Sequence, residues 1–379
     1  MTNQLVSCEL LKKAQKILFI IPRSISHFTY LYGYFVAFAK EYPHLKIDLW
    51  IDERNKTRCF WKWKKLKRYG LYDWTQESAY FNKVYTQTYS PSLFKQSLAQ
   101  AQSQAYEVVV SLDRSRCLYS ARLTRRISPN GFIAAVGKPP KWYNFLTRWH
   151  ASKLNVLLDT TKYSDKGHIF DQYARWFEEL FGLTIIFDER NLFIDIPRRW
   201  ISFAKLRFLK WGLDKKSRNF GKVFFINLFG PSEQQSWPLE KALEMMNALK
   251  RSELGADVNF IVNVQSAQLQ QVRKFFDRYS FNDMIIFSPS DNFFQLPAII
   301  VQCDLVISVQ TSVLHLARAL KIPTIALVNH LESEMIPRDL HDWQILLSDN
   351  KNKGMSSISS QQVIQAIQSS SRFSTEKTY

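Results

Sequence analysis

Residues 301–328, VQCDLVISVQTSVLHLARALKIPTIALV, have the pattern of a strand, a turn, a helix and a second strand. Leu305–Val309 is apolar and rich in β-branched residues, which is typical of a strand buried on both faces. Gln310, Thr311 and Ser312 form a polar break where the first N–H groups of a helix need partners. Both hydroxyls are good candidates for the helix N-cap.

The helix that follows has one apolar stripe, because apolar residues recur at i, i+3, i+4 and i+7. These residues are Val313, Leu316, Ala317 and Leu320. The same spacing places His315 and Arg318 on the other side of the helix. Pro323 ends it, and Thr324–Val328 supplies the second strand.

A strand that leads into a hydroxyl-bearing turn at a helix N-terminus offers N–H groups and a positive dipole end to an anion. Ligands of parallel sheets bind outside the carboxyl ends of the strands. Diphosphate is the anion that we expect here. An ordinary βαβ unit with a capped helix has the same pattern, so the pattern alone leaves both interpretations open.

Composition indicates a folded intracellular chain with a polyanionic partner. With 379 residues it is long enough for two domains, and 46% hydrophobic residues exclude global disorder. Its four cysteines have no paired spacing, which favours a reducing cytoplasm over a zinc site or disulfides. We find no signal peptide and no apolar run of about 18 residues. The net charge of +18 and the 28 Phe, 16 Tyr and 11 Trp favour nucleic acid or an anionic membrane surface with its phosphorylated glycolipid.

The N-terminal half opens as a βαβ unit. Lys16–Pro22 is predicted as a buried strand, Phe28–Glu41 as a helix and Lys46–Asp52 as a second strand. The loop between the first strand and the helix carries His27. An imidazole at this position can accept a proton near neutral pH, and an exposed histidine at a helix start is the alternative.

Residues 54–68, RNKTRCFWKWKKLKR, combine basic and aromatic side chains, among them Trp61, Lys62, Trp63, Lys64 and Lys65. Trp at headgroup depth and Lys or Arg on lipid phosphates is the mixture of membrane-interface segments. Single-stranded nucleic acid would also suit it through base stacking. Because no RNA-binding motif occurs elsewhere, we favour a membrane.

The rest of the N-terminal half is read as follows. Tyr106–Leu112 is predicted as a strand and Asp113–Arg126 as a basic helix that includes Arg114 and Arg116. Residues 138–168 are predicted as a loop-rich excursion. His168–Leu183 is predicted as an amphipathic helix that ends at Gly182, with His168 in a capping or packing role.

We place the domain boundary in the charged stretch 205–221, which gives domains 1–210 and 211–379. The second domain is predicted to alternate strands and helices. Its expected strands are Lys222–Leu228, Val258–Val264, Met284–Phe287, Leu305–Val309 and Thr324–Val328, and its expected helices are Pro238–Arg251, 267–279, Phe293–Cys303 and Gln361–Ile367.

The 301–328 segment resembles the C-terminal signature of glycosyltransferase family 9, the heptosyltransferases. That signature runs apolar strand, Asp-Thr-Gly, two residues, His-hydrophobic-Ala, small residues, Pro and a second apolar strand. The matching residues are Thr311, His315, Leu316, Ala317, Ala319 and Pro323. Gln310 and Ser312 depart from it, since the family usually has Asp and Gly there.

Two further loops carry the resemblance. In the family's N-terminal signature a Gly-Asp pair starts the first helix, and here Ser26 and His27 take those places. The strand 222–228 and its loop resemble the family's donor-diphosphate loop in Asn227, Gly230, Ser232, Trp237 and Pro238. Gln235 replaces the usual Lys of that loop, and Gln265 or Gln268 replaces a Glu that grips the ribose or base.

The resemblance implies an α/β chain of GT-B architecture, in which two Rossmann-like domains with parallel sheets face a central cleft. It implies inverting transfer, without metal or cofactor, from a nucleotide-diphosphate sugar such as ADP-heptose to a lipopolysaccharide core or lipid A acceptor. His27 takes the role of base, and Ser232, Thr311 and Ser312 contact the diphosphate. Gln235 and Gln310 lie near the donor sugar, Gln268 near the nucleoside, and His315 shapes its loop. Arg114 and Arg116 face the phosphorylated acceptor.

The resemblance also implies a monomer on the cytoplasmic face of the inner membrane, with no specific nucleic acid as partner. Four charged family positions are neutral or titratable here, so either the donor differs from ADP-heptose or the chain is a degenerate relative that binds without turnover. A basic protein that binds membrane or nucleic acid without catalysis is the interpretation from another class.

Overall fold

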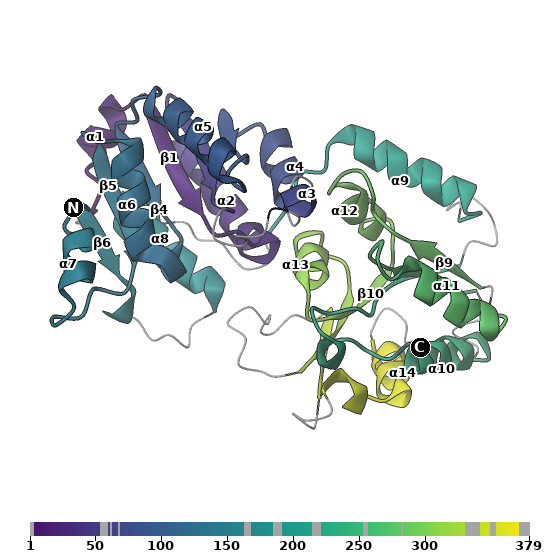
Figure 1. Ribbon diagram of the computed structural model, residues 1–379. Helices are drawn as coiled ribbons and strands as arrows, with labels where there is room; N and C mark the ends of the chain where they lie inside the picture. The colour runs from purple at the N-terminus through teal and green to yellow at the C-terminus, as the bar shows by residue number, and fades with distance from the viewer. Residues whose placement is uncertain are drawn as a thin grey trace, which may run out of the picture. The chain divides into compact units, whose positions relative to one another are not determined.

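The computed structural model describes residues 4–53, 60, 63–66, 69–162, 168–184, 192–213, 221–252, 257–281, 283–329, 342–348 and 354–370 (Figure 1). The chain divides into two compact units, Met1–Asn191 and Leu192–Tyr379. This boundary lies before the predicted one at residue 210, because helix α9 (Arg198–Lys210) belongs to the second unit. Ala204 and Phe208 form its buried side, and it packs against α12 (Gln295–Ile300).

The N-terminal unit contains a six-stranded parallel sheet in the order β3-β2-β1-β4-β5-β6. Its strands are β1 (Lys16–Ile21), β2 (Lys46–Ile51), β3 (Lys83–Tyr85), β4 (Val108–Ser111), β5 (Phe132–Gly137) and β6 (Val156–Asp159). Its helices are α1 (Cys8–Lys13), α2 (Ile25–Glu41), α3 (Trp63–Leu66), α4 (Gly70–Glu77), α5 (Pro91–Gln102), α6 (Cys117–Ile127), α7 (Phe145–Ala151) and α8 (Ile169–Phe181).

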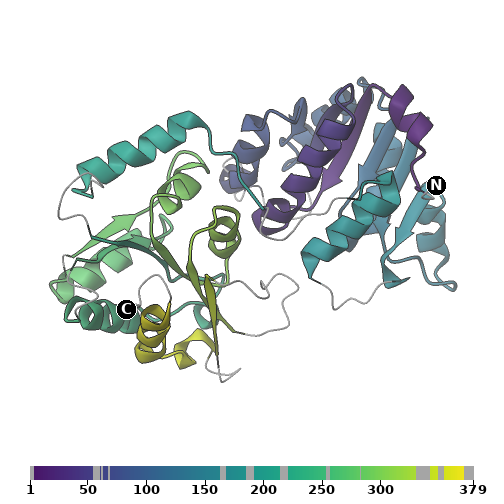
Figure 2. The ribbon, with the colours of Figure 1, turned by 180° about the vertical axis from the view of Figure 1, so that it is seen from behind.

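The alternation of side chains along β1 explains how helices cover both faces of this sheet. Phe19 packs edge-on against Phe35 and Phe38 of α2 and Phe181 of α8. Leu18 and Ile20 point the opposite way, into a core shared with α5 and α6. Figure 2 shows this unit from behind, with α2 and α8 in front of the strands. Helix α8 ends at Gly182, whose φ of 69° is the left-handed conformation that glycine adopts without strain.

The C-terminal unit repeats this plan with the order β12-β11-β10-β7-β8-β9, also parallel in every pair. Its strands are β7 (Val223–Asn227), β8 (Asn259–Asn263), β9 (Met284–Phe287), β10 (Leu305–Val309), β11 (Thr324–Val328) and β12 (Trp343–Leu347). Besides α9 and α12 its helices are α10 (Leu239–Lys250), α11 (Leu269–Arg278), α13 (Ser312–Ala319) and α14 (Ser360–Ser369). Helices α10, α11 and α14 share one core with the sheet, while Leu314 of α13 packs on the other face against Ala326 and Val328.

Both sheets have a point at which the chain changes the side on which it adds strands. In the N-terminal sheet this point lies between β1 and β4, and in the C-terminal sheet between β7 and β10. In open α/β sheets ligands bind outside the carboxyl ends of the strands at such a point. The fold therefore predicts that ligands bind at the loops after β1, β4, β7 and β10.

The predicted fold class, an α/β chain with two Rossmann-like units, is confirmed. The strands 284–287, 305–309 and 324–328 have the predicted bounds. The prediction of a loop-rich excursion over 138–168 is wrong, since this stretch contains α7 and β6.

A buried carboxylate in the middle of β2 is satisfied by partners from two other segments. Asp48 is fully buried and accepts hydrogen bonds from the Tyr106 hydroxyl and from Nδ2 of Asn82 (2.9 Å). Tyr85 Oη lies 3.0 Å from Tyr106 Oη. Burial and the hydrogen bond with Asp48 raise the pKa of Tyr106, so this hydroxyl stays protonated and remains a donor.

We expect the substitution Tyr106→Phe to lower the free energy of unfolding by about 1–3 kcal/mol, since it leaves a buried carboxylate oxygen without its donor. Urea denaturation measures this loss. Tyr85→Phe is the matched control, because that hydroxyl contacts Tyr106 and not Asp48. Equal losses in the two variants would show that the carboxylate contact has no special weight.

Candidate active site

The carboxamide of Asn227, the last residue of β7, joins three neighbouring strands of the C-terminal sheet. Its Nδ2 donates to Ser308 Oγ of β10 and to Thr311 Oγ1 of the next turn, both at 3.0 Å. Its Oδ1 accepts from Nδ2 of Asn263, the last residue of β8, at 2.8 Å. Both Nδ2 hydrogens are used, so the amide has one orientation. The Thr311 turn is therefore fixed to the carboxyl ends of β7 and β8.

Thr311 is the N-cap of α13, as the sequence predicted. Its Oγ1 accepts from the backbone N–H of Val313 at 3.3 Å and from Asn227. A hydroxyl oxygen has two acceptor sites, and both are occupied. Its hydrogen donates to no acceptor among the described residues, and the side chain is half-buried. Thr311 can therefore donate to an external anion.

The two neighbours of Thr311 are also half-buried at the start of α13, where Gln310 precedes the cap and Ser312 is the first helical residue. The far side of the helix differs from a simple amphipathic pattern. His315 and Arg318 are only 5% and 4% exposed, so α13 is buried all round from Val313 to Ala319. This burial is consistent with the structural role predicted for His315.

The loop after β7 is held by its own hydrogen bonds. Gly230 N donates to Ser236 Oγ (3.0 Å), and Ser236 Oγ donates to Ser232 O (2.8 Å). Ser232 Oγ donates to Oε1 of Gln235 at 3.1 Å, and both side chains are exposed. A Cβ at Gly230 would lie 2.3 Å from the Gln235 carbonyl oxygen, so only glycine fits there. Two predicted donor residues, Ser232 and Gln235, thus form one exposed polar pair.

Trp237 and Pro238 act as supports in this unit. Trp237 is 1% exposed, and its Nε1 donates to Ile358 O at 3.0 Å, which ties the loop to the segment before α14.

Gln268, after β8, is half-buried, and its Oε1 accepts from the backbone N–H of Gln265 at 3.4 Å. The predicted donor residues therefore follow β8, β7 and β10, three adjacent strands, and all lie at one edge of the sheet.

In the N-terminal unit the loop after β1 brings His27 into contact with α8. Ser24 caps α2 and accepts from His27 N at 3.4 Å, so His27 lies in the first helical turn. Its Nδ1 is 2.6 Å from the hydroxyl of Tyr173, a side chain that is 1% exposed. The ring is thereby oriented by a residue 146 positions away.

Gln172, the residue before Tyr173 in α8, contacts the loop after β4. Arg114 Nη1 donates to Oε1 of Gln172 at 3.1 Å. Gln172 and Tyr173 are consecutive, so α8 connects the two loops at the point where strand addition changes side. His168 begins this helix as its N-cap, with Nδ1 accepting from Phe170 N at 3.2 Å and only 4% of the residue exposed. The capping role predicted for His168 is confirmed.

An ion pair that the sequence reasoning missed lies at the same edge. Arg23 Nη1, after β1, is 3.5 Å from Oε2 of the fully buried Glu53, after β2. The Tyr69 hydroxyl donates to Arg23 O at 2.6 Å, and burial together with the Glu53 carboxylate raises the pKa of Tyr69 to about 12. These contacts hold the loop before His27. An acidic pair, Asp52-Glu53, directly after a buried strand was the available signal.

The predicted acceptor and membrane residues are described only in part. Arg114 is placed as above. Trp61 and Lys62 lie outside the described residues, and the side chains of Lys64, Lys65 and Arg116 are not described. Trp63 is half-buried, with its indole nitrogen shielded from solvent. In the described part of the chain, the search for a helix with the length and apolar character of a membrane span found none.

Comparisons with known proteins agree with this fold. Residues 215–362 match the model of glycosyltransferase family 9 (heptosyltransferase). The chain is similar to the structure of a glycosyl transferase family 9 protein from Veillonella parvula, with a TM-score of 0.70, 15% identity and 97% of each chain covered. No curated protein sequence matches the chain.

Two Escherichia coli structures are also similar. Heptosyltransferase WaaC with ADP-2-deoxy-2-fluoro heptose has a TM-score of 0.65 and 13% identity, with 93% of this chain and 99% of that chain covered. ADP-heptose lps heptosyltransferase II has a TM-score of 0.60 and 13% identity, with 92% and 96% covered. At these identities the likeness establishes the fold, and residues 215–362 are the part of the chain that is similar in sequence to glycosyltransferase family 9.

That match spans β7, β8 and β10 with their loops, and so contains Asn227 and the Thr311 turn. The similarity to glycosyltransferase family 9 therefore covers the sheet edge of the C-terminal unit at which the candidate donor residues lie.

Proposed function

We propose that this protein transfers a sugar, with inversion, from a nucleotide-diphosphate donor to a hydroxyl of a lipopolysaccharide core or lipid A acceptor. The observation that supports this most directly is the Asn227 network, which presents the Thr311 hydroxyl at the carboxyl edge of the family-matched sheet. The donor's nucleotide and sugar are part of the proposal, with ADP-heptose as the reference compound.

The donor diphosphate is held by neutral groups. Ser232, Thr311 and Ser312 are the predicted diphosphate contacts. The predicted donor-binding residues as a whole include no Asp, Glu, Lys or Arg: Gly230, Ser232, Gln235, Gln268, Gln310, Thr311, Ser312 and His315. Hydroxyl and amide donors, with the positive end of the α13 dipole, stabilise the charge that develops on the leaving diphosphate. No metal ion or cofactor is part of this proposal.

His27 takes the proton of the acceptor hydroxyl. The tautomer with its hydrogen on Nδ1 donates to Tyr173 Oη and leaves the lone pair on Nε2, where it can accept a proton. In the other tautomer the tyrosine donates, and Nε2 carries a hydrogen and cannot act as a base. Whether His27 can act as the base therefore depends on which of the two residues donates the hydrogen bond in its contact with Tyr173.

The acceptor is bound on the side of Arg114, and Arg116 follows in the same turn, η2 (Arg114–Arg116). Guanidinium groups suit the phosphates of a lipopolysaccharide core. Attachment to the cytoplasmic face of the inner membrane through Trp61, Lys62, Trp63, Lys64 and Lys65 belongs to the same proposal. Undiminished vesicle binding after Glu replaces Lys62, Lys64 and Lys65 would remove this segment from it.

The donor is tested by adding ADP-, UDP-, GDP- and CMP-sugars to the protein and measuring its melting temperature. A ligand that binds only the folded state at a hundred times its Kd adds about 2.7 kcal/mol of stability, which raises the melting temperature measurably. We expect one nucleotide class to do so, followed by transfer of its sugar to truncated lipopolysaccharide. If no member of the panel raises the melting temperature, the proposed donor class is wrong.

Thr311→Val should raise the Kd for the donor about tenfold or more, because a hydrogen bond to a charged group contributes about 1.5–3 kcal/mol. Thr311→Ser is the matched control, since it keeps the cap, the contact with Asn227 and the donated hydrogen. Titration calorimetry measures both. Equal affinities for the valine and serine variants would place the diphosphate elsewhere.

His27→Ala should lower kcat by about 10²–10⁴-fold, the usual contribution of general acid–base catalysis, and leave the Kd for the donor unchanged. Tyr173→Phe should lower kcat by a smaller factor and move the acidic limb of the pH–rate profile, as expected of a positioning residue. Steady-state rates between pH 5 and 9 provide both readouts. A His27→Ala enzyme with wild-type kcat rules out this base.

A further inference from the structure

We propose that the loop before α7 and α7 itself form a docking surface for an anionic bilayer. We call it the α7 surface and define it by Lys141, Trp142, Tyr143, Phe145, Arg148, Trp149 and Lys153. It shares no residue with the segment 54–68 or with the candidate active site, and it adds a second bilayer contact to the membrane attachment of the proposed function, on which it rests.

Exposed aromatic side chains are concentrated here. Trp142 is 83% exposed, Tyr143 63%, Phe145 79% and Trp149 53%. Among the described residues only five other large hydrophobic side chains are comparably exposed, and they are scattered: Leu5, Phe60, Leu206, Leu209 and Tyr279. Four such aromatics within eight consecutive positions form a patch, and patches of this kind mark interaction sites.

The charge around these aromatics is entirely positive. Residues 114–158 contain no Asp or Glu and nine Lys or Arg: Arg114, Arg116, Arg122, Arg125, Arg126, Lys138, Lys141, Arg148 and Lys153. Lys141 Nζ lies 5.7 Å from the centre of the Tyr143 ring, and Lys153 Nζ lies 3.9 Å from that of Trp149. Partial burial, and after it the charges of Arg122 and Lys153, lower the pKa of His150.

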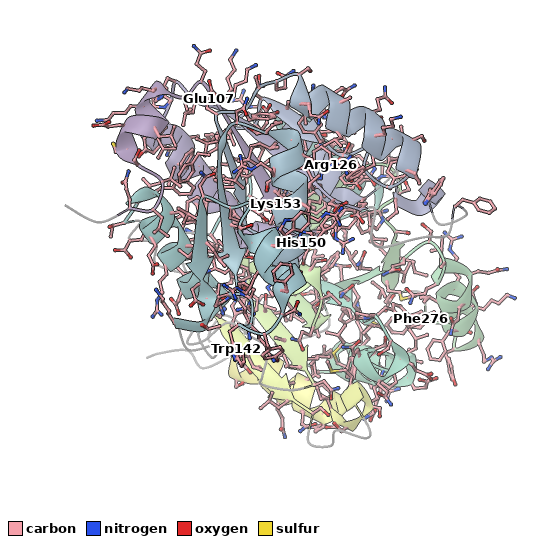
Figure 3. The ribbon with its side chains drawn as sticks, turned by 60° about the vertical axis from the view of Figure 1, so that its left-hand side comes forward. Glu107, Arg126, Trp142, His150, Lys153 and Phe276 are labelled. Atoms are coloured by element: carbon pink, nitrogen blue, oxygen red, sulfur yellow. The ribbon has the colours of Figure 1, made fainter. Side chains whose placement is uncertain are left out.

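The helix is held in place from beneath. Arg125 of α6 donates to Lys153 O through Nε (3.1 Å) and Nη2 (2.8 Å), and α6 packs against α7. The Asn144 side chain caps α7 by accepting from Thr147 N at 3.2 Å. Figure 3 labels Trp142 in the loop before α7, His150 on α7 and Lys153 just after it, together with Arg126 of α6. The aromatics are thus presented by a supported helix.

An anionic bilayer fits this surface better than the other partners do. Trp and Tyr beside Lys and Arg are the composition of membrane interfaces, where rings lie at headgroup depth and cations meet lipid phosphates. A second copy of the chain would place the same cations against one another. Single-stranded nucleic acid is bound by aromatics within a groove that follows its backbone, whereas side chains exposed to 83% and 79% stand out from the surface.

The position of the surface in the fold is also informative. The loop that carries Trp142 and Tyr143 follows β5 at Gly137, so it starts at the same sheet edge as the loops with His27 and Arg114. Docking through this surface brings that edge of the unit toward the lipid.

The test uses the full chain and vesicles of phosphatidylcholine and phosphatidylglycerol at 3:1, with neither donor nor acceptor present. The variant Trp142→Ser/Phe145→Ser/Trp149→Ser should lose at least tenfold in partition coefficient measured by co-flotation. Leu206→Ser/Leu209→Ser on α9 is the matched control, because those leucines are 59% and 58% exposed among basic residues. It should bind within twofold of the wild type.

A second variant, Lys141→Glu/Arg148→Glu/Lys153→Glu, tests the charges. At low salt its partition coefficient should fall well below that of the wild type. At high salt the difference between the two proteins should be smaller, because charge interactions are screened. Because Lys141 and Arg148 are exposed and Lys153 is only half-buried, melting temperatures and transfer to a water-soluble acceptor sugar should be unchanged, which separates this proposal from the proposed function.

The proposal is overturned if the aromatic variant binds vesicles like the wild type or if the α9 control loses as much. It is also overturned if the aromatic substitutions change only the oligomeric state in sedimentation or only the binding of oligo(dT), since a second copy or a nucleic acid would then be the occupant.

Discussion

A parallel sheet in which the chain changes the side of strand addition is the constraint on which the rest of this protein depends. It brings the ends of β7 and β10, which are some eighty positions apart in sequence, next to each other. Their loops must then be locked together, because loops on their own have no fixed geometry. The Asn227 carboxamide does this with three hydrogen bonds. One of them occupies an acceptor site of Thr311 Oγ1, so that the hydroxyl hydrogen of Thr311 remains for a ligand.

The N-terminal unit meets the same constraint in a different way. The loops to be joined in this unit follow β1 and β4. Helix α8 joins them from outside the sheet, with Gln172 on Arg114 and Tyr173 on His27. A helix can do this precisely only if its own position is fixed, and Tyr34, Phe170 and Phe177 pack at its buried face. Aromatic packing between α2 and α8 is therefore part of how the candidate base is oriented.

The sequence was sufficient for the strands buried on both faces, because continuous β-branched runs such as Leu305–Val309 have few other interpretations. It failed where tertiary contacts decide the structure. β3 has three residues, and β12 is half-buried along its length, so neither has a strong pattern. The α7 segment was predicted as part of a loop-rich stretch because Pro139-Pro140 and aromatic residues lie there, and in the structure those aromatics are exposed. The contact between His27 and Tyr173 depends on packing that no local spacing encodes.

The distribution of charge separates the two surfaces that this chain presents. The candidate donor loops 228–237 and 308–314 together contain a single charged residue, Glu233, so the net charge of +18 is not located at the proposed diphosphate site. It is concentrated instead in stretches such as 114–158, which lie in the other unit and carry the exposed aromatics. A diphosphate bound through oriented hydroxyls and amides needs little net charge, because preorganised dipoles lose no energy on reorientation. Binding to an anionic bilayer becomes stronger with the number of basic residues, because each one near the surface adds about 1 kcal/mol to the binding free energy. The large positive charge thus fits the proposed bilayer surface better than the proposed donor site.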